Sequence, residues 1–132
     1  MPTHRRTFPG LPEEVSRARH WIREILGGHP CAQDAELIVT ELSANAITHT
    51  DSAGAAFRVA VTCAGDTVKI AVTDAGGAHR RPHIEHQDGS SPHGRGLFLV
   101  FACASTVDIR GDHHGHTVTA KLTGKPTSTR TC

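Results

Sequence analysis

DAELIVTELSANAITHT, residues 34–50, is the segment from which the architecture of this chain follows. Its apolar residues recur with the period of a helix that buries one face: Ala35, Ile38, Val39, Leu42 and Ala46. At about 100° per residue, Glu41, Asn45 and His49 fall in one strip roughly 80° wide at the border of that face. A carboxylate and a carboxamide at such a border are costly to desolvate without partners. A hydrated metal ion with phosphates is one candidate partner, and an ordinary solvated strip is the alternative.

Length and composition indicate one compact domain that comprises residues 1–132, with flexible ends at residues 1–7 and 124–132. The chain is 37% hydrophobic and 20% charged, and its net charge of +1 gives no basic field for direct nucleic-acid binding. No apolar run reaches the ~20 residues of a membrane span, and no signal peptide is recognisable. The four cysteines are scattered without a CxxC pair, so we expect reduced thiols and a cytoplasmic protein.

One helix precedes the 34–50 segment, and several elements follow it. Pro12 and two acids open the first helix, and Gly27-Gly28 ends it. The other predicted elements are a weak edge strand over 5–8, strands over 57–63 and 68–73, a buried helix over 94–105, and strands over 107–110 and 117–122. This order predicts an α+β fold, a two-layer sandwich with helices on one face of a mixed, mostly antiparallel sheet.

Two glycine motifs carry candidate chemistry. Asp74 follows a strand and precedes Gly76-Gly77, so its carboxylate can accept a hydrogen bond from an exocyclic amine such as that of adenine. Gly94-Arg95-Gly96-Leu97 stands at a predicted helix start, where unobstructed backbone amides and an arginine can hold phosphate. Taken singly, each motif has a plain alternative, a strand-end turn for the first and close helix–sheet packing for the second.

The combination is more specific than its parts. An E-x3-N helix, a strand ending in DxG, a loop, and GxG-L before a buried helix together resemble the ATP-binding (Bergerat) fold of histidine kinases and DNA gyrase, the GHKL superfamily. Within it, the short domain is most similar to bacterial anti-sigma factors with serine-kinase activity. The opening segment FPGLPEEVSRARHWIREIL is similar to small actinobacterial regulators of that group, and the resemblance covers about residues 8–122.

The resemblance implies roles residue by residue. Asn45 matches the asparagine that ligates Mg²⁺ on ATP, and Glu41 matches the acid that acts as base or orients the nucleophile. Asp74 matches the adenine-reading aspartate, followed by Gly76, and Thr117 is the candidate match for a threonine that borders adenine on the last hairpin. The matches to the phosphate loop are Gly94, Arg95, Gly96 and Leu97.

The sequence also departs from the family pattern. The family's DxGxG places glycine where this chain has Ala78, and its Gly-Thr pair on the last hairpin is His116-Thr117 here. The lid segment, 77–93, is short and has no lysine, although Arg80 and Arg81 can reach phosphates. The extra methyl of Ala78 puts nucleotide affinity in question rather than the fold.

Two functions follow from the resemblance. The first is an ATP- and Mg²⁺-dependent serine/threonine-protein kinase that phosphorylates an anti-sigma-factor antagonist and binds a sigma factor, with a homodimer as one candidate assembly. The second is a protein-binding switch with weak or no nucleotide turnover. Intact Glu41 and Asn45 favour the kinase, and Ala78 with the altered hairpin favours the switch.

The eleven histidines suggest zinc as a third, more distant hypothesis. His79, His83, His86 and His93 share one polar segment, but Pro82 and Pro92 interrupt any helix that would align them. His113, His114 and His116 form a second group, and neither group has the closed spacing of a structural zinc site. We therefore expect solvated histidines.

Overall fold

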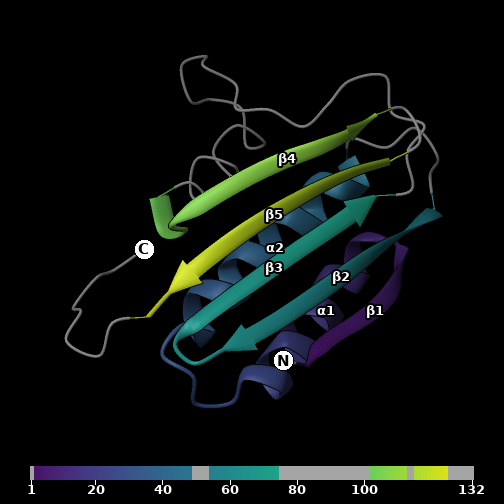
Figure 1. The fold of residues 1–132 in the computed structure, drawn as a ribbon. Coiled ribbons are helices and arrows are strands. Elements are labelled where there is room, and N and C mark those ends of the chain that lie inside the picture. Colours follow the sequence, from purple (N-terminus) through teal and green to yellow (C-terminus); the bar gives the residue numbers. More distant parts are fainter. Residues whose placement is uncertain (1, 49–53, 75–101, 113–114, 125–132) are drawn as a thin grey trace.

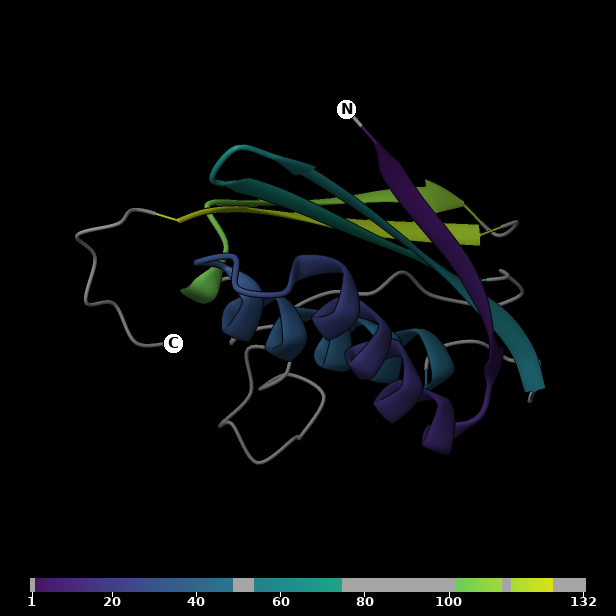
Figure 2. The ribbon, with the colours of Figure 1, turned by 90° about the horizontal axis from the view of Figure 1, so that it is seen from below.

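The computed structural model describes residues 2–48, 54–74, 102–112 and 115–124. Within these ranges two helices lie on one face of a five-stranded sheet, as Figure 1 and Figure 2 show from two sides. In chain order the elements are β1 (Thr3–Gly10), α1 (Pro12–Leu26), α2 (Ala32–Thr48), β2 (Gly54–Ala64), β3 (Thr67–Asp74), β4 (Thr106–Asp112) and β5 (Gly115–Thr123). The predicted α+β sandwich with helices on one face is therefore confirmed.

The sheet has the strand order β1-β2-β3-β5-β4. We predicted a mixed, mostly antiparallel sheet, and all four pairings between the described strands are antiparallel. Two of these pairings are hairpins, β2–β3 and β4–β5, which can only be antiparallel. The β2–β3 turn is tight because Gly65 adopts φ +61°, a conformation that costs glycine little.

Helix α1 begins and ends where the sequence predicts. Pro12 stands in its first turn with Glu13 and Glu14 near the positive end of the helix dipole. Gly27 follows the last residue with φ 53°, and its N–H donates to the Arg23 carbonyl at 3.0 Å. One residue per turn is buried: Glu14, Ala18, Ile22 and Leu26.

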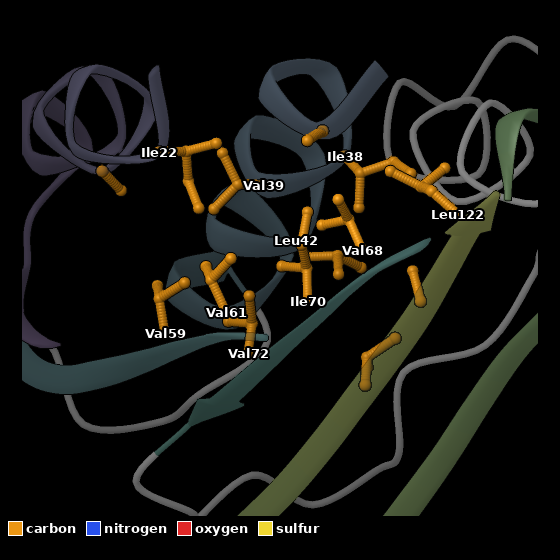
Figure 3. Close-up of a cluster of buried hydrophobic side chains, with 14 of the residues drawn as sticks. Ile22, Ile38, Val39, Leu42, Val59, Val61, Val68, Ile70, Val72 and Leu122 are labelled. Carbon is orange, nitrogen blue, oxygen red and sulfur yellow. The ribbon is translucent and has the colours of Figure 1, made fainter. Parts of the chain in front are cut away.

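The core lies between α2 and the centre of the sheet. Ile38 and Leu42 of α2 point toward Val68 and Ile70 of β3 (Figure 3), and all four side chains are at most 2% exposed. Alternate residues of β3 are buried, as expected for a strand with one covered face. The apolar face of the predicted 34–50 helix is therefore the one that meets the sheet.

An ion pair joins the two helices at their outer side. The Arg23 guanidinium donates from Nη2 to Glu36 Oε1 at 2.8 Å and from Nε to Oε2 at 3.2 Å. This pair of hydrogen bonds lowers the pKa of the Glu36 carboxyl. Because the Arg23 side chain is 54% exposed, water screens much of the attraction.

Strand β1 forms one edge of the sheet and is longer than the predicted strand over 5–8. Thr3 to Thr7, which we expected within a flexible end, pair with β2. Phe8 anchors this edge, with its ring stacked on Phe57 at 5.4 Å and edge-on to Trp21 at 5.8 Å between centroids. The Arg6 guanidinium lies 5.0 Å from the centroid of the same ring.

The link between α1 and α2 is hydrogen-bonded to the β2–β3 turn through His29. The N–H of Cys31 donates to His29 Nδ1 at 3.0 Å, and His29 Nε2 lies 2.8 Å from the Gly65 carbonyl oxygen. Since Nδ1 accepts, the proton of a neutral ring sits on Nε2 and is donated to Gly65. His29 is therefore placed as one tautomer by two backbone groups.

Gly124 completes this end of the sandwich. It is buried, and its N–H donates to the Asp66 carbonyl at 2.7 Å, although we expected the flexible C-terminal end to begin there. A Cβ on Gly124 would lie 2.9 Å from Pro30 Cβ and 3.0 Å from Cys31 Sγ, so only glycine fits without a shift. We term this region the closed end, comprising His29, Cys31, Gly65, Asp66 and Gly124.

Several predictions fall on residues outside the described ranges. They concern most of the buried helix over 94–105, the lid over 77–93, and residues 125–132. Of the predicted helix, Ala102 and Cys103 are described and helical, whereas Ala104 and Ser105 are described and not helical. Among the described residues, no disulfide links Cys31, Cys63 or Cys103, and no helix is long and apolar enough to cross a membrane.

Candidate functional site

Polar residues of α2, β3 and β5 gather at the end of the sandwich opposite the closed end. Helix α2 and strand β3 both run toward this end, and β5 starts there (Figure 1). Leu42 points toward Ile70, and the next turn of α2 therefore advances along β3 toward Asp74 (Figure 3). We term this group the polar end, comprising Glu41, Asn45, Asp74 and His116.

Asp74 is the last residue of β3 and is 6% exposed. Its side chain continues the buried series of Ile70 and Val72, so it faces the helix layer. The backbone N–H of His116 donates to Asp74 Oδ1 at 3.0 Å. The neighbouring strand thus fixes the orientation of a buried carboxylate.

His116 is the residue of this site that sequence reasoning missed. It is 3% exposed, and its Nδ1 lies 3.7 Å from Asp74 Oδ2 without a hydrogen bond to any described group. The sequence held a usable signal, because alternation along residues 116–122 places His116 on the side of the buried Val118. The register Thr73↔Thr117 then sets His116 beside Asp74.

Thr117 lies on the other face of the sheet. Its Oγ1 is 2.9 Å from Thr73 Oγ1, and both residues point away from the helices. Our assignment of Thr117 as a residue that borders adenine beside Asp74 therefore needs correction. The period of two along β5 gives that place to His116.

Asn45 and Glu41 stand in the last two turns of α2. Asn45 is 5% exposed, and its buried Nδ2 has no hydrogen-bond partner within the described part of the chain, whereas Glu41 is half-buried. The last turn of α2 has no basic residue, so the negative end of the helix dipole is not offset there. A cation bound beside these two side chains would be favoured by the dipole, and an anion bound to that cation could accept from Asn45 Nδ2.

The remaining predicted site residues lie outside the described ranges. They are His49, Gly76, Gly94, Arg95, Gly96 and Leu97. Most of the histidines also lie there, and among the residues that are described no group of three His, Cys, Asp or Glu side chains is arranged to hold a metal ion. The described part of the site thus consists of one fixed carboxylate, one buried imidazole and the two polar side chains of α2.

Comparison with known proteins gives matches consistent with this arrangement. The family model of the histidine kinase-like ATPase domain matches residues 8–122. The crystal structure of the RsbU and RsbW domains of Rv1364c from Mycobacterium tuberculosis superposes over 94% of this chain with a TM-score of 0.69 and 23% identity. The histidine kinase domain of a blue-light activated histidine kinase from Erythrobacter litoralis EL346 covers 88% of it, with a TM-score of 0.52 and 19% identity.

These two structures are larger than this chain. The match covers 32% of the Mycobacterium tuberculosis chain and 61% of the Erythrobacter litoralis chain. At such identities the likeness concerns the fold. No curated protein matches the sequence.

Proposed function

The chain belongs to the histidine kinase-like ATPase domain family, and from that premise we propose that it binds ATP with Mg²⁺ and acts as a serine/threonine-protein kinase. The substrate in this proposal is an anti-sigma-factor antagonist, and a sigma factor is the second partner. The sequence resemblance to anti-sigma factor kinases supports this choice of partners.

The polar end is the observation that carries the proposal. Asp74 presents a buried carboxylate whose Oδ1 is held by a backbone N–H, so the carboxylate is oriented before any ligand arrives. A carboxylate held in this way can accept from the exocyclic amine of adenine, whereas guanine presents a carbonyl at the equivalent position. We therefore assign the adenine to Asp74.

The α2 side chains fit the phosphates and Mg²⁺. Asn45 offers its amide oxygen as a metal ligand, and its Nδ2, which no described residue hydrogen-bonds, as a donor to a phosphate oxygen. When bound, Mg²⁺ neutralises phosphate charge during transfer. Arg95 and the glycines at 94 and 96 are proposed to hold the phosphates from the other side, in keeping with the sequence motif.

Glu41 is the proposed base. It stands one helical turn before Asn45, on the same strip of α2, and is half-buried. The substrate hydroxyl oxygen bonds to the γ-phosphorus, its proton passes to the Glu41 carboxylate, and the bond from the γ-phosphorus to the bridging oxygen breaks to release ADP. A base in this position typically contributes ~10²–10⁴-fold to the rate.

His116 favours a second candidate function. Its imidazole packs beside Asp74 Oδ2, where it takes up space next to the carboxylate proposed to read adenine. A protein with such a side chain can bind nucleotide weakly and use it to set its shape, without turnover. The alternative is a protein-binding switch.

One experiment separates these functions. Purified protein is incubated with Mg²⁺ and γ-labelled ATP and a candidate antagonist, using wild type, Glu41→Gln, Asn45→Ala and the control Gln33→Ala. Gln33 is exposed at the far end of α2, so its replacement should leave both binding and transfer unchanged. Glu41→Gln should bind ATP normally but transfer phosphate ~10²–10⁴-fold more slowly, and Asn45→Ala should lose Mg²⁺-dependent ATP affinity.

Each result that contradicts the proposal excludes a different part of it. Wild-type protein that binds its partner and ATP but never phosphorylates the partner would be a switch rather than a kinase. Unchanged transfer by Glu41→Gln would exclude Glu41 as the base. Absence of any ATP binding by the wild type would remove both nucleotide-dependent functions.

A further inference from the structure

The face of the sheet turned away from the helices carries a regular set of mostly polar side chains, which are exposed or half-buried. Strand registers arrange them in three rows across the sheet. The first row is Thr7, Arg58, Thr73, Thr117 and Arg110; the second is Arg5, Ala60, Ala71, Thr119 and Asp108; the third is Thr3, Thr62, Lys69, Lys121 and Thr106. We term this surface the open face; Figure 2 shows it on the side of the sheet away from α1 and α2.

Each of the five strands contributes one cation to the open face, and all five cations are exposed: Arg5, Arg58, Lys69, Arg110 and Lys121. Asp108 is the one carboxylate among the described side chains of this face, and Arg110 already binds it at 2.6 Å. Four cations therefore face solvent with no acid beside them on the described part of this face. The net charge of the whole chain is only +1, so positive charge is concentrated here.

Among the five cations of the open face, Lys69 and Lys121 give the clearest indication of a function. They are directly opposite each other on the adjacent central strands β3 and β5. Like charges at directly opposite positions destabilise a sheet. The flanking residues of the row are threonines, and the diagonal neighbour of Lys121, Asp108, is already paired with Arg110. A pair of residues that destabilises the sheet without a structural gain indicates a binding role.

We propose that the open face docks an acidic segment of a partner protein, with carboxylates placed over Lys69 and Lys121. The small side chains of the middle row, Ala60, Ala71 and Thr119, allow a peptide backbone to approach the sheet closely. The threonine hydroxyls beside the lysines donate to carboxylate oxygens. This site is separate from the polar end and does not rest on the proposed kinase function.

Other occupants fit the open face less well. A second copy of this chain would bring one open face of four unpaired cations against another. Single-stranded nucleic acid would be expected to meet aromatic side chains for stacking, and the described side chains of this face include none. An acidic polypeptide matches both the charge and the small side chains.

Fluorescence anisotropy of a fluorescein-labelled oligoglutamate peptide at low salt tests the proposal. The variants are Lys69→Gln/Lys121→Gln and, as a control of equal net charge, Arg17→Gln/Arg19→Gln on α1 in the opposite layer. The lysine variant should bind about tenfold more weakly, the effect expected from losing two exposed charge contacts. The control should bind within twofold of the wild type, and added salt should weaken binding of both.

A second variant excludes a merely structural role. Lys121→Glu sets a carboxylate opposite Lys69, so the midpoint of thermal unfolding should rise or stay constant while peptide affinity falls. A structural residue would instead lower both quantities. In the wild type, the amide resonances of Ala71 and Thr119 should shift on peptide addition.

Four results would overturn the proposal. They are no peptide binding at low salt, equal affinity of the wild type and Lys69→Gln/Lys121→Gln, tighter binding of a DNA duplex of matched charge than of the peptide, and concentration-dependent self-association that the lysine variant abolishes. Equal affinity of the two proteins would show that the lysines do not contact the peptide. Tighter binding of DNA would show that the surface binds phosphates, and self-association lost in the lysine variant would show that the surface binds a second copy of this chain.

Discussion

The closed end and the polar end lie at opposite ends of the same helix–sheet interface, and they differ in the hydrogen bonding of their polar groups. At the closed end, His29 accepts from one backbone group and lies within hydrogen-bond distance of another, and the N–H of Gly124 reaches the Asp66 carbonyl. At the polar end, Asn45 Nδ2 and His116 Nδ1 are buried and have no hydrogen-bond partner among the residues that the structure describes.

This difference in hydrogen bonding suggests that the closed end stabilises the fold and that the polar end binds a ligand. Buried polar atoms are nearly always hydrogen-bonded, because an unmet donor or acceptor costs about 1–3 kcal/mol. The closed end pairs its polar groups within the chain, although Gly65 and Asp66 are exposed there and His29 is half-buried. Among the described residues, the polar end leaves two buried atoms without a partner, which a ligand could hydrogen-bond. Changes at the polar end should therefore alter binding, and changes at the closed end should alter stability.

The largest expected effect is on nucleotide binding. Asp74→Asn keeps an oxygen that can accept from the N–H of His116, but it removes the charge presented to adenine. ATP should bind about 1–3 kcal/mol more weakly, with little change in the free energy of unfolding. Isothermal titration with ATP and GTP measures this, with Asp66→Asn at the closed end as control. Equal wild-type affinity for ATP and GTP would exclude Asp74 as the adenine reader.

Gly124→Ala tests the closed end by steric means. The new Cβ would lie 2.9 Å from Pro30 Cβ and 3.0 Å from Cys31 Sγ, so the link before α2 must shift. The free energy of unfolding should fall by about 1–3 kcal/mol, as in other overpacked sites, while ATP affinity of the folded protein stays the same. Urea unfolding measures the change. Gly28→Ala is the matched control, because no atom lies within 4 Å of its added Cβ.

His29→Ala tests the same end by removing its hydrogen bonds. The N–H of Cys31 and the carbonyl of Gly65 each lose a partner. We expect a loss of about 1–2 kcal/mol in the free energy of unfolding. His20→Ala, at an exposed position of α1, should have no measurable effect. If the two variants were equally stable, the His29 contacts would not hold the closed end.

The smallest effect concerns the ion pair between α1 and α2, away from both ends. Arg23 lowers the pKa of Glu36, so the pair contributes stability above the ordinary pKa of the carboxyl and loses it as pH falls through the lowered value. Glu36→Gln should cost about 0.5 kcal/mol at neutral pH and nothing in strong acid. Urea unfolding at several pH values measures this. A constant difference across pH would mean that the charge of Glu36 is not involved.

The sequence predicted the elements of the fold better than their pairing. Period and end signals located α1, α2 and the hairpin of β2 and β3, because Pro12, Gly27 and Gly65 act locally. Strand β1 gave only a weak signal, since Phe8 is its one large buried residue. Its pairing with β2 depends on contacts distant in the chain, which local patterns do not encode.

The candidate site was predicted from motifs, and one residue was placed on the wrong side of the sheet. Asp74 stands at the end of a strand, where its face follows from alternation along β3. The assignment of Thr117 came from likeness to a family pair, which does not specify the strand register. One step in register exchanges Thr117 for His116 and moves the site to the other face.

The pairing of β1 with β2 also has a consequence for biosynthesis. Thr3 pairs with Thr62 and Phe8 with Phe57, so β1 can pair only after both helices and most of β2 have been translated. During that interval an unpaired strand carrying an aromatic side chain is available to other nascent chains. His4, Arg5 and Arg6 keep this strand charged or polar, and Pro9 removes one donor from it. The sequence of β1 is thus suited to remaining solvated until β2 has been translated.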